Sequence, residues 1–581
     1  MAEKKHRLLI GAAAFLLLLC TFLANVKNIY TSCQIDAEYQ VTMAYRLLRG
    51  DAMFSKMWEA HQTSAFFLAF FEWIFLKITN STTGIMVYAN AVGFLCKTAV
   101  AFTVYGTLRK YIDKRIAFGA LLFVLNTYPK DSVLPDFANL QIWFALLLMC
   151  CLIAYFLGQG RSIWLFLGAV CLCLEVLAYP SCALVWIPCV VLICMYSRHK
   201  KRDVCIFTGV CAVGGGAYLL YFMRGNPGRF LEYIYYIWSG DESHAVGLGE
   251  RLAFMGQDLL ALANDMIYVV LLAMGAVVAA FICRAIHTGG KSLGGFWHVA
   301  FSWFVALYIV GYLIGLRVEE AGTKHHFFVL YLVVECVAFL TARYLNPTEK
   351  KIFVIGQAIG AGGFVATLIL SDLGLFPTLP YLIPNLCVSL LPLTKAFGTG
   401  QEGNEESWRR SLWRFFPVMM LCAVMLFRNM VYLNGWMIAP SNFREDSIFG
   451  VDWTAQKGPL KGIVNREGTY VADVSYAEWQ ELIVPGDRVL VISYPTLTPT
   501  VYLYQDVEIC ADSTISTPTY SERLFTYWEE NPEKYPNVVV AKCYGGNLMV
   551  GEYNEVVEWL TEKFEADEVV DGTFWRYYIH R

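Results

Sequence analysis

Two carboxylates stand close together in a short polar stretch between apolar segments of this chain. The stretch, TSCQIDAEYQVTMAYRLLRGD over residues 31–51, carries Asp36 and Glu38. A carboxylate that is held in place can take a proton from a hydroxyl or an amine, so this stretch is a candidate for acid–base chemistry. The alternative is structural, because an aspartate just before a helix commonly caps it.

A helical stripe follows the two carboxylates. Tyr39, Met43 and Leu47 recur every four residues, which predicts a short amphipathic helix over residues 37–48, with Asp36 at its N-cap. Such a helix next to apolar segments is expected to lie along a membrane surface.

Further acidic and imidazole groups follow at the ends of nearby apolar segments. The loop ends in MWEAHQTSAFF, which places His61 near the same interface, and the next polar loop, YPKDSVLPDF, brings Asp131 and Asp136. Asp36, Asp131 and Asp136 are the candidates for holding a divalent cation, Mg²⁺ or Mn²⁺, because such ions prefer carboxylate oxygens.

Basic groups in later loops supply the opposite charge. Arg224, Arg317, Lys324 and His325 are candidates for holding a phosphate, which arginine binds through two parallel hydrogen bonds. The carboxylates and these cations together suit the transfer of a group from a lipid phosphate to an acceptor.

The composition sets the class of protein. Of 581 residues, 57% are hydrophobic and 16% are charged, against about 25% charged residues in soluble chains, and the mean hydropathy is +0.48. Apolar runs long enough to cross a bilayer as helices recur from Leu8 to Leu433. The chain is therefore predicted to be a polytopic α-helical membrane protein.

Basic clusters predict the orientation of these helices. KKHR near the N-terminus and SRHKKR near residue 200 mark the cytoplasmic side. Counting from them gives about thirteen spans in residues 1–433, a first external loop at 28–62, and a cytoplasmic N-terminus. The expected location is the plasma membrane, crossed many times.

Residues 434–581 have a different pattern. DRVLVIS, VEICADS and NVVVAKC read as strands, whereas SERLFTYWEEN and NEVVEWLTEKF read as helices. Alternating signals of this kind predict a small α/β domain, which the topology places on the extracytoplasmic side.

Charge and cysteine content exclude some functions. The net charge of −3 gives no basic field for nucleic acid, so membrane lipids are the expected surroundings. The 18 cysteines form no CxxC pairs and lie mostly in apolar segments. Cys510 and Cys543 lie in the polar C-terminal region and could form a disulfide.

The order of these motifs resembles one known family. Helix 1, then Asp36 in IDAEYQVTMAYRLLRGD, then MWEAHQTSAFFLAFF, looks like the GT-C class of polyprenyl-phosphate-sugar-dependent glycosyltransferases, in its protein-mannosyltransferase-like and aminoarabinose-transferase-like branches. That family's first external loop carries a catalytic Asp, then an aromatic residue and an LL-x-G turn. The residues that match this order are Asp36, Tyr39, Leu47, Leu48 and Gly50.

The resemblance implies roles for individual residues. Asp36 would be the general base, Tyr39 and His61 would line the substrate site, and Asp131 or Asp136 would be the second acid. Glu38 departs from the family pattern, in which the second acid often follows the first directly. The implied reaction moves a sugar from a polyprenyl-phosphate donor to a glycan, lipid or protein acceptor of the cell envelope, with inversion.

A multi-pass transporter or lipid flippase is the alternative function. Transporters place polar groups near the bilayer midplane, often on broken helices in paired halves. Here the polar groups gather on one predicted face, which favours the enzyme.

Overall fold

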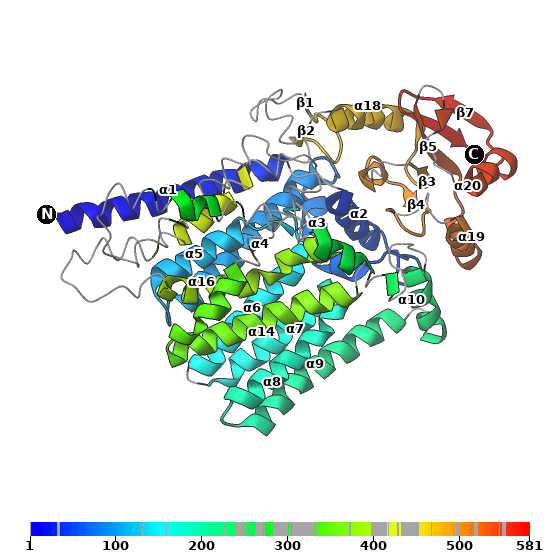
Figure 1. Ribbon diagram of the computed structural model, residues 1–581. Coiled ribbons are helices and arrows are strands. Elements are labelled where there is room, and N and C mark those ends of the chain that lie inside the picture. The colour runs from blue at the N-terminus through cyan, green and yellow to red at the C-terminus, as the bar shows by residue number, and fades with distance from the viewer. Residues whose placement is uncertain are drawn as a thin grey trace.

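The structure of the protein is a computed structural model (Figure 1). It describes residues 2–31, 35–129, 132–158, 160–224, 227–239, 334–370, 374–396, 453–465, 467–493, 499–515, 521–544 and 554–581, with shorter stretches within 249–282, at 300, 304 and 331, within 415–430, and at 547–548.

Five of the described helices are long and apolar enough to cross a membrane, judged by length and composition. The composition and these helices together support a membrane location. The five helices are α1 (Ala2–Thr31), α4 (Ile85–Leu108), α6 (Phe137–Leu157), α9 (Lys200–Met223) and α14 (Pro347–Leu370).

Shorter helices complete the described part of the bundle. The predicted hairpin of residues 163–197 is formed by α7, the 3₁₀ turn η3 and α8. The spans predicted at 264–284 and 296–316 lie mostly outside the described residues, and that at 326–342 lies partly outside them, so the count of about thirteen stays a prediction. The shorter helices are α3 (Ala65–Thr79), α5 (Lys114–Leu125), α7 (Ser162–Ala178), η3 (Pro180–Val185), α8 (Trp186–Tyr196), α10 (Phe230–Ser239), α15 (Leu375–Thr378), η6 (Leu379–Leu382) and α16 (Ile383–Ala396).

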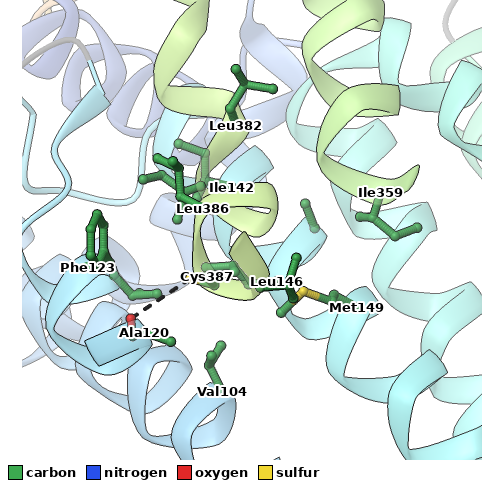
Figure 2. Close-up of a cluster of buried hydrophobic side chains, with 14 of the residues drawn as sticks. Val104, Ala120, Phe123, Ile142, Leu146, Met149, Ile359, Leu382, Leu386 and Cys387 are labelled. Atoms are coloured by element: carbon green, nitrogen blue, oxygen red, sulfur yellow. Dashed lines mark hydrogen bonds between the residues drawn. The ribbon is translucent and has the colours of Figure 1, made fainter. Parts of the chain in front are cut away.

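The core of the bundle lies between α5, α6, α14 and α16. Figure 2 shows side chains of these helices meeting, with Phe123, Leu146 and Leu386 among them, all at most 2% exposed. The Cys387 thiol donates to the Ala120 carbonyl oxygen at 3.9 Å, so α16 and α5 lie in contact (Figure 2).

A glycine lets the second polar loop lie against α4. A Cβ atom on Gly93 would stand 2.1 Å from the carbonyl oxygen of Val133, which no side chain could tolerate. This close approach positions the loop that leads to Asp136 beside α4.

The C-terminal region is built on a mixed sheet. Its strand order is β4-β3-β5-β8-β7, where β4, β3 and β5 are parallel and β8 and β7 are antiparallel. The three predicted strands and two predicted helices are confirmed. The elements are α18 (Glu467–Leu482), β3 (Arg488–Ile492), η8 (Pro499–Leu503), β4 (Glu508–Ile509), α19 (Ser521–Glu530), β5 (Val538–Tyr544), α20 (Asn554–Glu558), β7 (Glu568–Asp571) and β8 (Trp575–Ile579).

The possible disulfide in this region does not form. Cys510 follows β4 and Cys543 lies on β5, and both are free thiols. The reason is the strand order, because β3 lies between β4 and β5 and adjacent strands are already about 4.8 Å apart.

The helix after the first carboxylates differs from its prediction in two ways. It is α2 (Ile35–Leu48), so Asp36 and Glu38 lie in its first turn and Asp36 is not its N-cap. The helix also does not lie on a surface. Tyr39 and Met43 on the apolar stripe are buried, but Gln40 and Thr42 are fully buried as well. The physical reason is that α2 is enclosed between α3 and the C-terminal domain (Figure 1).

A buried arginine joins α2 to the C-terminal domain. Arg46 is 1% exposed, and its Nε lies 2.6 Å from Asp51 Oδ2 while its Nη1 lies 3.2 Å from Glu59 Oε1. Its Nη2 donates to the Tyr527 hydroxyl on α19 at 3.0 Å. Burial alone would lower the pKa of Arg46, but Tyr527, Asp51 and Glu59 raise it above its ordinary value, so the charge is kept.

Both acidic partners of Arg46 reach the C-terminal domain themselves. Asp51 Oδ1 lies 2.6 Å from the Nζ of Lys534, which is 2% exposed. Glu59 accepts hydrogen bonds from the Ser513 hydroxyl at 2.7 Å and from the Thr514 amide at 3.1 Å. Ser513 and Thr514 follow β4, so Glu59 lies at the carboxyl end of that strand. The first loop and the domain thus share one buried ionic network.

Aromatic packing extends this junction to α10. The Trp58 ring stacks on Tyr236 at 4.8 Å and meets Tyr527 edge-on at 5.3 Å. On the opposite side of α10, Leu231 and Tyr235 are 78% and 66% exposed. One face of α10 therefore packs on the junction, and its other face offers apolar and aromatic groups of the kind found at membrane interfaces.

Replacing Arg46 should undo this junction. Arg46→Met leaves Glu59 buried without its cation and leaves Asp51 with Lys534 alone, which should cost about 3–5 kcal/mol. We expect a clear drop in the thermal midpoint and faster proteolysis between the membrane helices and the C-terminal domain.

Arg49→Met is the matched control. Arg49 pairs with Asp506 at 2.6 Å, but the two side chains are 49% and 52% exposed, so its loss should cost less than about 1 kcal/mol. Equal effects of the two substitutions would contradict a special role for Arg46.

Candidate functional site

The described residues of the candidate site lie on α2, at the start of α6 and in η6. Asp36, in the first turn of α2, is partly exposed, and Asp136, at the start of α6, is fully buried. Both carboxylates act electrostatically on the Tyr381 hydroxyl. Two acids that are 100 residues apart in sequence therefore lie within electrostatic range of one buried hydroxyl.

Tyr381 is a residue that the sequence analysis did not single out. It lies in η6, is 3% exposed, and its hydroxyl finds no hydrogen-bond partner among the described residues. A buried hydroxyl without a partner costs about 1–3 kcal/mol, so such a group is expected where a substrate supplies the partner. The only signal in the sequence is the irregular, proline-rich FPTLPYLIP, which breaks the helix.

Asp136 also has a structural role. Its Oδ1 accepts a hydrogen bond from the Asn139 amide at 2.7 Å, so it is the N-cap of α6. The Asn139 side chain in turn donates to the carbonyl oxygens of Ser132 and Leu134 at 3.1 and 3.0 Å. The cap fixes the direction of the Asp136 carboxylate as well as the start of the helix.

His61 joins three segments of the chain at this place. Its ring stacks on Phe137 at 3.8 Å with an interplanar angle of 10°, and lies 5.4 Å from the ring of Tyr179. Phe137 follows Asp136 directly, and Tyr179 ends α7. The Thr63 hydroxyl supports the same contact by donating to the Leu177 carbonyl oxygen at 2.7 Å. The predicted substrate-site histidine is thus held next to Asp136.

Tyr39 is a buried neighbour of His61 and Glu59. It is 2% exposed and packs in the core between α2, α3 and α4. Burial raises the pKa of its hydroxyl well above the ordinary value, and the nearby Glu59 carboxylate raises it further. The side chain stays neutral, which suits packing and positioning.

Glu38 reaches toward the C-terminal domain. Its Oε2 accepts a hydrogen bond from the Thr500 hydroxyl at 2.6 Å and a longer one from the Thr500 amide at 3.4 Å. Thr500 lies in η8, which follows β3. This contact ties the first turn of α2, and so Asp36, to the domain.

The basic candidates are only partly described. Arg224, after α9, is exposed, lies 4.0 Å from the centre of the Tyr221 ring and donates to the hydroxyl of that tyrosine at 3.1 Å. These contacts stay local and do not bring Arg224 to the two carboxylates. Asp131, Arg317, Lys324 and His325 lie outside the described residues.

The described residues form no group of three or more His, Cys, Asp or Glu side chains that could hold a metal ion. Of the three predicted metal ligands, Asp36 and Asp136 both lie within electrostatic range of Tyr381, whereas Asp131 is not described. Binding of Mg²⁺ or Mn²⁺ stays a prediction.

The arrangement is suited to acid–base chemistry on a substrate with hydroxyl groups. It offers a partly exposed carboxylate, a buried carboxylate, a hydroxyl with no hydrogen-bond partner among the described residues, and the aromatic cluster of His61, Phe137 and Tyr179. Aromatic faces and precisely placed polar groups are typical of sites that bind small molecules.

No family model and no curated protein matches this chain. Among solved structures, the chain is similar to ArnT from Cupriavidus metallidurans in the apo state, at 13% identity, over 98% of each chain, with a TM-score of 0.41. It is similar to the same protein bound to undecaprenyl phosphate, at 13% identity, over 98% of this chain and 97% of that one, with a TM-score of 0.42. It is also similar to the Archaeoglobus fulgidus oligosaccharyltransferase, at 11% identity, over 90% of this chain and 67% of that one, with a TM-score of 0.40. These values describe a distant similarity that extends along most of the chain.

Proposed function

We propose that this protein is a membrane glycosyltransferase that moves a sugar from a polyprenyl-phosphate donor to an acceptor on the extracytoplasmic face of the plasma membrane. The observation that supports the proposal is that Asp36 and Asp136 both lie within electrostatic range of the buried Tyr381 hydroxyl, which has no hydrogen-bond partner among the described residues. The motif order around Asp36, which resembles the GT-C class, supports the choice of donor.

Asp36 is the general base in this proposal. It lies in the first turn of α2 and is partly exposed, so an acceptor hydroxyl or amine can reach it. The proton of the acceptor passes to the Asp36 carboxylate, the acceptor oxygen or nitrogen forms a bond to the anomeric carbon, and the bond from that carbon to the phosphate oxygen breaks. The polyprenyl phosphate leaves with the electron pair, and a single displacement inverts the anomeric centre.

The neighbouring groups position the substrates. Asp136 is buried and capped onto α6, so it orients a sugar or acceptor hydroxyl by accepting its hydrogen bond. Tyr381 donates its hydroxyl to a substrate oxygen, which removes the cost of leaving it unpaired. Glu38 holds the start of α2 against Thr500, and His61 forms part of the aromatic cluster. Phosphate binding by Arg224, Arg317, Lys324 or His325 belongs to the same proposal.

Replacing Asp36 tests the central claim. Asp36→Asn keeps the size of the side chain but cannot take the proton, so sugar transfer should fall by about 10²–10⁴. The assay offers radiolabelled polyprenyl-phosphate sugars to the purified protein in vesicles and follows label into a covalent product.

Asp506→Asn is the control, since Asp506 is an exposed carboxylate that pairs only weakly with Arg49. Full transfer by Asp36→Asn would show that Asp36 is not the general base. Movement of substrate across the vesicle membrane without any covalent product would instead favour a transporter.

The two roles of Asp136 can be separated with two substitutions. Asp136→Ala removes the cap of α6 and should destabilise the protein by about 1 kcal/mol, whereas Asp136→Ser keeps a capping oxygen and should recover most of that stability. Transfer should stay low in both variants, because both lack the carboxylate. Thermal unfolding and sugar transfer are measured for both variants. Recovered transfer in the serine variant would show that Asp136 acts only as the N-cap of α6.

Tyr381→Phe should affect stability and activity in opposite directions. The substitution removes a buried hydroxyl that has no described partner, so the thermal midpoint should stay equal or rise. Transfer should fall about tenfold or more, because the substrate loses a hydrogen bond. A variant that unfolds more easily and retains transfer would contradict the proposed contact.

A further inference from the structure

An apolar groove lies at the opposite end of the bundle from Asp36. It has a volume of about 220 Å³ and is bounded by the N-terminal part of α1, by α5 and by the helical residues 418–426. Its wall is almost entirely apolar, with Ala14 and Leu17 from α1, Phe118 and Leu122 from α5, and Met419.

The groove lies beside the part of α1 for which the described residues show no hydrogen bonds to other helices or loops. The hydrogen bonds that the described residues show between α1 and other helices or loops begin at Thr21. Asn126 donates to the Thr21 hydroxyl at 3.1 Å, Asn28 donates to Asn429 at 2.6 Å, and the Tyr128 hydroxyl donates to Asn25. These bonds lie toward the end of α1 that leads into the first loop.

The other half of α1 stands further from the bundle. Leu8 and Phe15 on this half are 74% and 66% exposed, compared with 49% and 57% for Phe22 and Leu23 on the other half, and Figure 1 shows the N-terminal half projecting beyond the other helices. An apolar cavity of this kind is not filled by water, and within a bilayer the hydrocarbon chain of a lipid is the available filler.

Cations stand at the mouth of the groove. Lys114 and Arg115, the first two residues of α5, both belong to its lining and are exposed. The Arg115 guanidinium lies 4.4 Å from the centre of the Phe415 ring, and Arg109 lies 5.3 Å from that of Tyr105, which also lines the groove. Asp113 lies 3.7 Å from Arg115 in an exposed pair, which contributes little to the stability of the protein.

We propose that this groove binds one anionic phospholipid from the leaflet at the Lys114 end, which the sequence predicts to be cytoplasmic. One acyl chain fills the space between α1 and α5, and the phosphate lies against Lys114 and Arg115. The charge at the mouth selects the anionic headgroup, because basic pockets between helices on this side of a membrane attract anionic lipids. The bound lipid supplies the packing that the N-terminal half of α1 lacks.

The experiment measures retained lipid by native mass spectrometry. The full-length protein is released from vesicles of equal parts phosphatidylglycerol and phosphatidylcholine, and the proposal expects one phosphatidylglycerol to stay bound in preference to phosphatidylcholine. The double variant Lys114→Gln, Arg115→Gln should weaken the preference for phosphatidylglycerol roughly thirtyfold. Each basic residue near an anionic membrane surface contributes about 1 kcal/mol to binding, which is about fivefold in affinity, and the two factors multiply. Ala14→Phe fills the groove while keeping both cations, and should abolish retention of the lipid.

The double variant Lys200→Gln, Lys201→Gln is the matched control. These two lysines are exposed at the start of α9, on the same predicted side of the membrane, and do not line the groove. The control should keep the bound lipid. Equal loss in the control, unchanged binding in the Lys114 and Arg115 variant, or full retention in Ala14→Phe would each overturn the proposal, and none of these outcomes depends on sugar transfer.

Discussion

The buried guanidinium of Arg46 is the interaction on which the arrangement of the candidate site depends. Removing a charged group from water costs several kcal/mol unless its partners replace the lost hydration. The partners of Arg46 come from two parts of the chain, with Asp51 and Glu59 in the first loop and Tyr527 in the C-terminal domain. The first loop supplies both carboxylates that balance the charge, and the domain covers the guanidinium and adds the Tyr527 hydroxyl, so α2 and the domain share one buried junction.

This dependence extends to Asp36. Glu38, two residues further along α2, is held by Thr500, and Arg46 fixes the last turn of the same helix. Both ends of α2 are thus set against the C-terminal domain. The domain therefore helps to hold the helix that carries Asp36, although it contributes neither carboxylate near Tyr381.

Sequence reasoning found the elements of this fold better than their contacts. The strands around Val489 and Val540 could be predicted because their β-branched runs are local signals. The burial of α2 could not, because Gln40 and Thr42 look like a solvent-facing side until a domain more than 400 residues away covers them. The same holds for Glu59, whose partners Ser513 and Thr514 carry no signal that points back to the first loop.

The candidate site shows a similar division. Asp36 and Asp136 could be selected because charged residues between apolar segments are conspicuous, and a resemblance to a known family ordered them. Tyr381 could not be selected, because a tyrosine in an apolar segment is ordinary until its hydroxyl is found buried without a partner. Arg317, Lys324 and His325 lie outside the described residues, so the phosphate-binding side of the proposal rests on the sequence.

Glu59 has one more consequence for the C-terminal domain. Open sheets with parallel strands usually receive nucleotides or other small anions beyond the carboxyl ends of those strands. Here that position after β4 already holds the Glu59 carboxylate, grasped by the Ser513 hydroxyl and the Thr514 amide. A side chain of the first loop thus occupies the place where a bound anion would lie. A free anion could bind at this edge only by displacing the first loop.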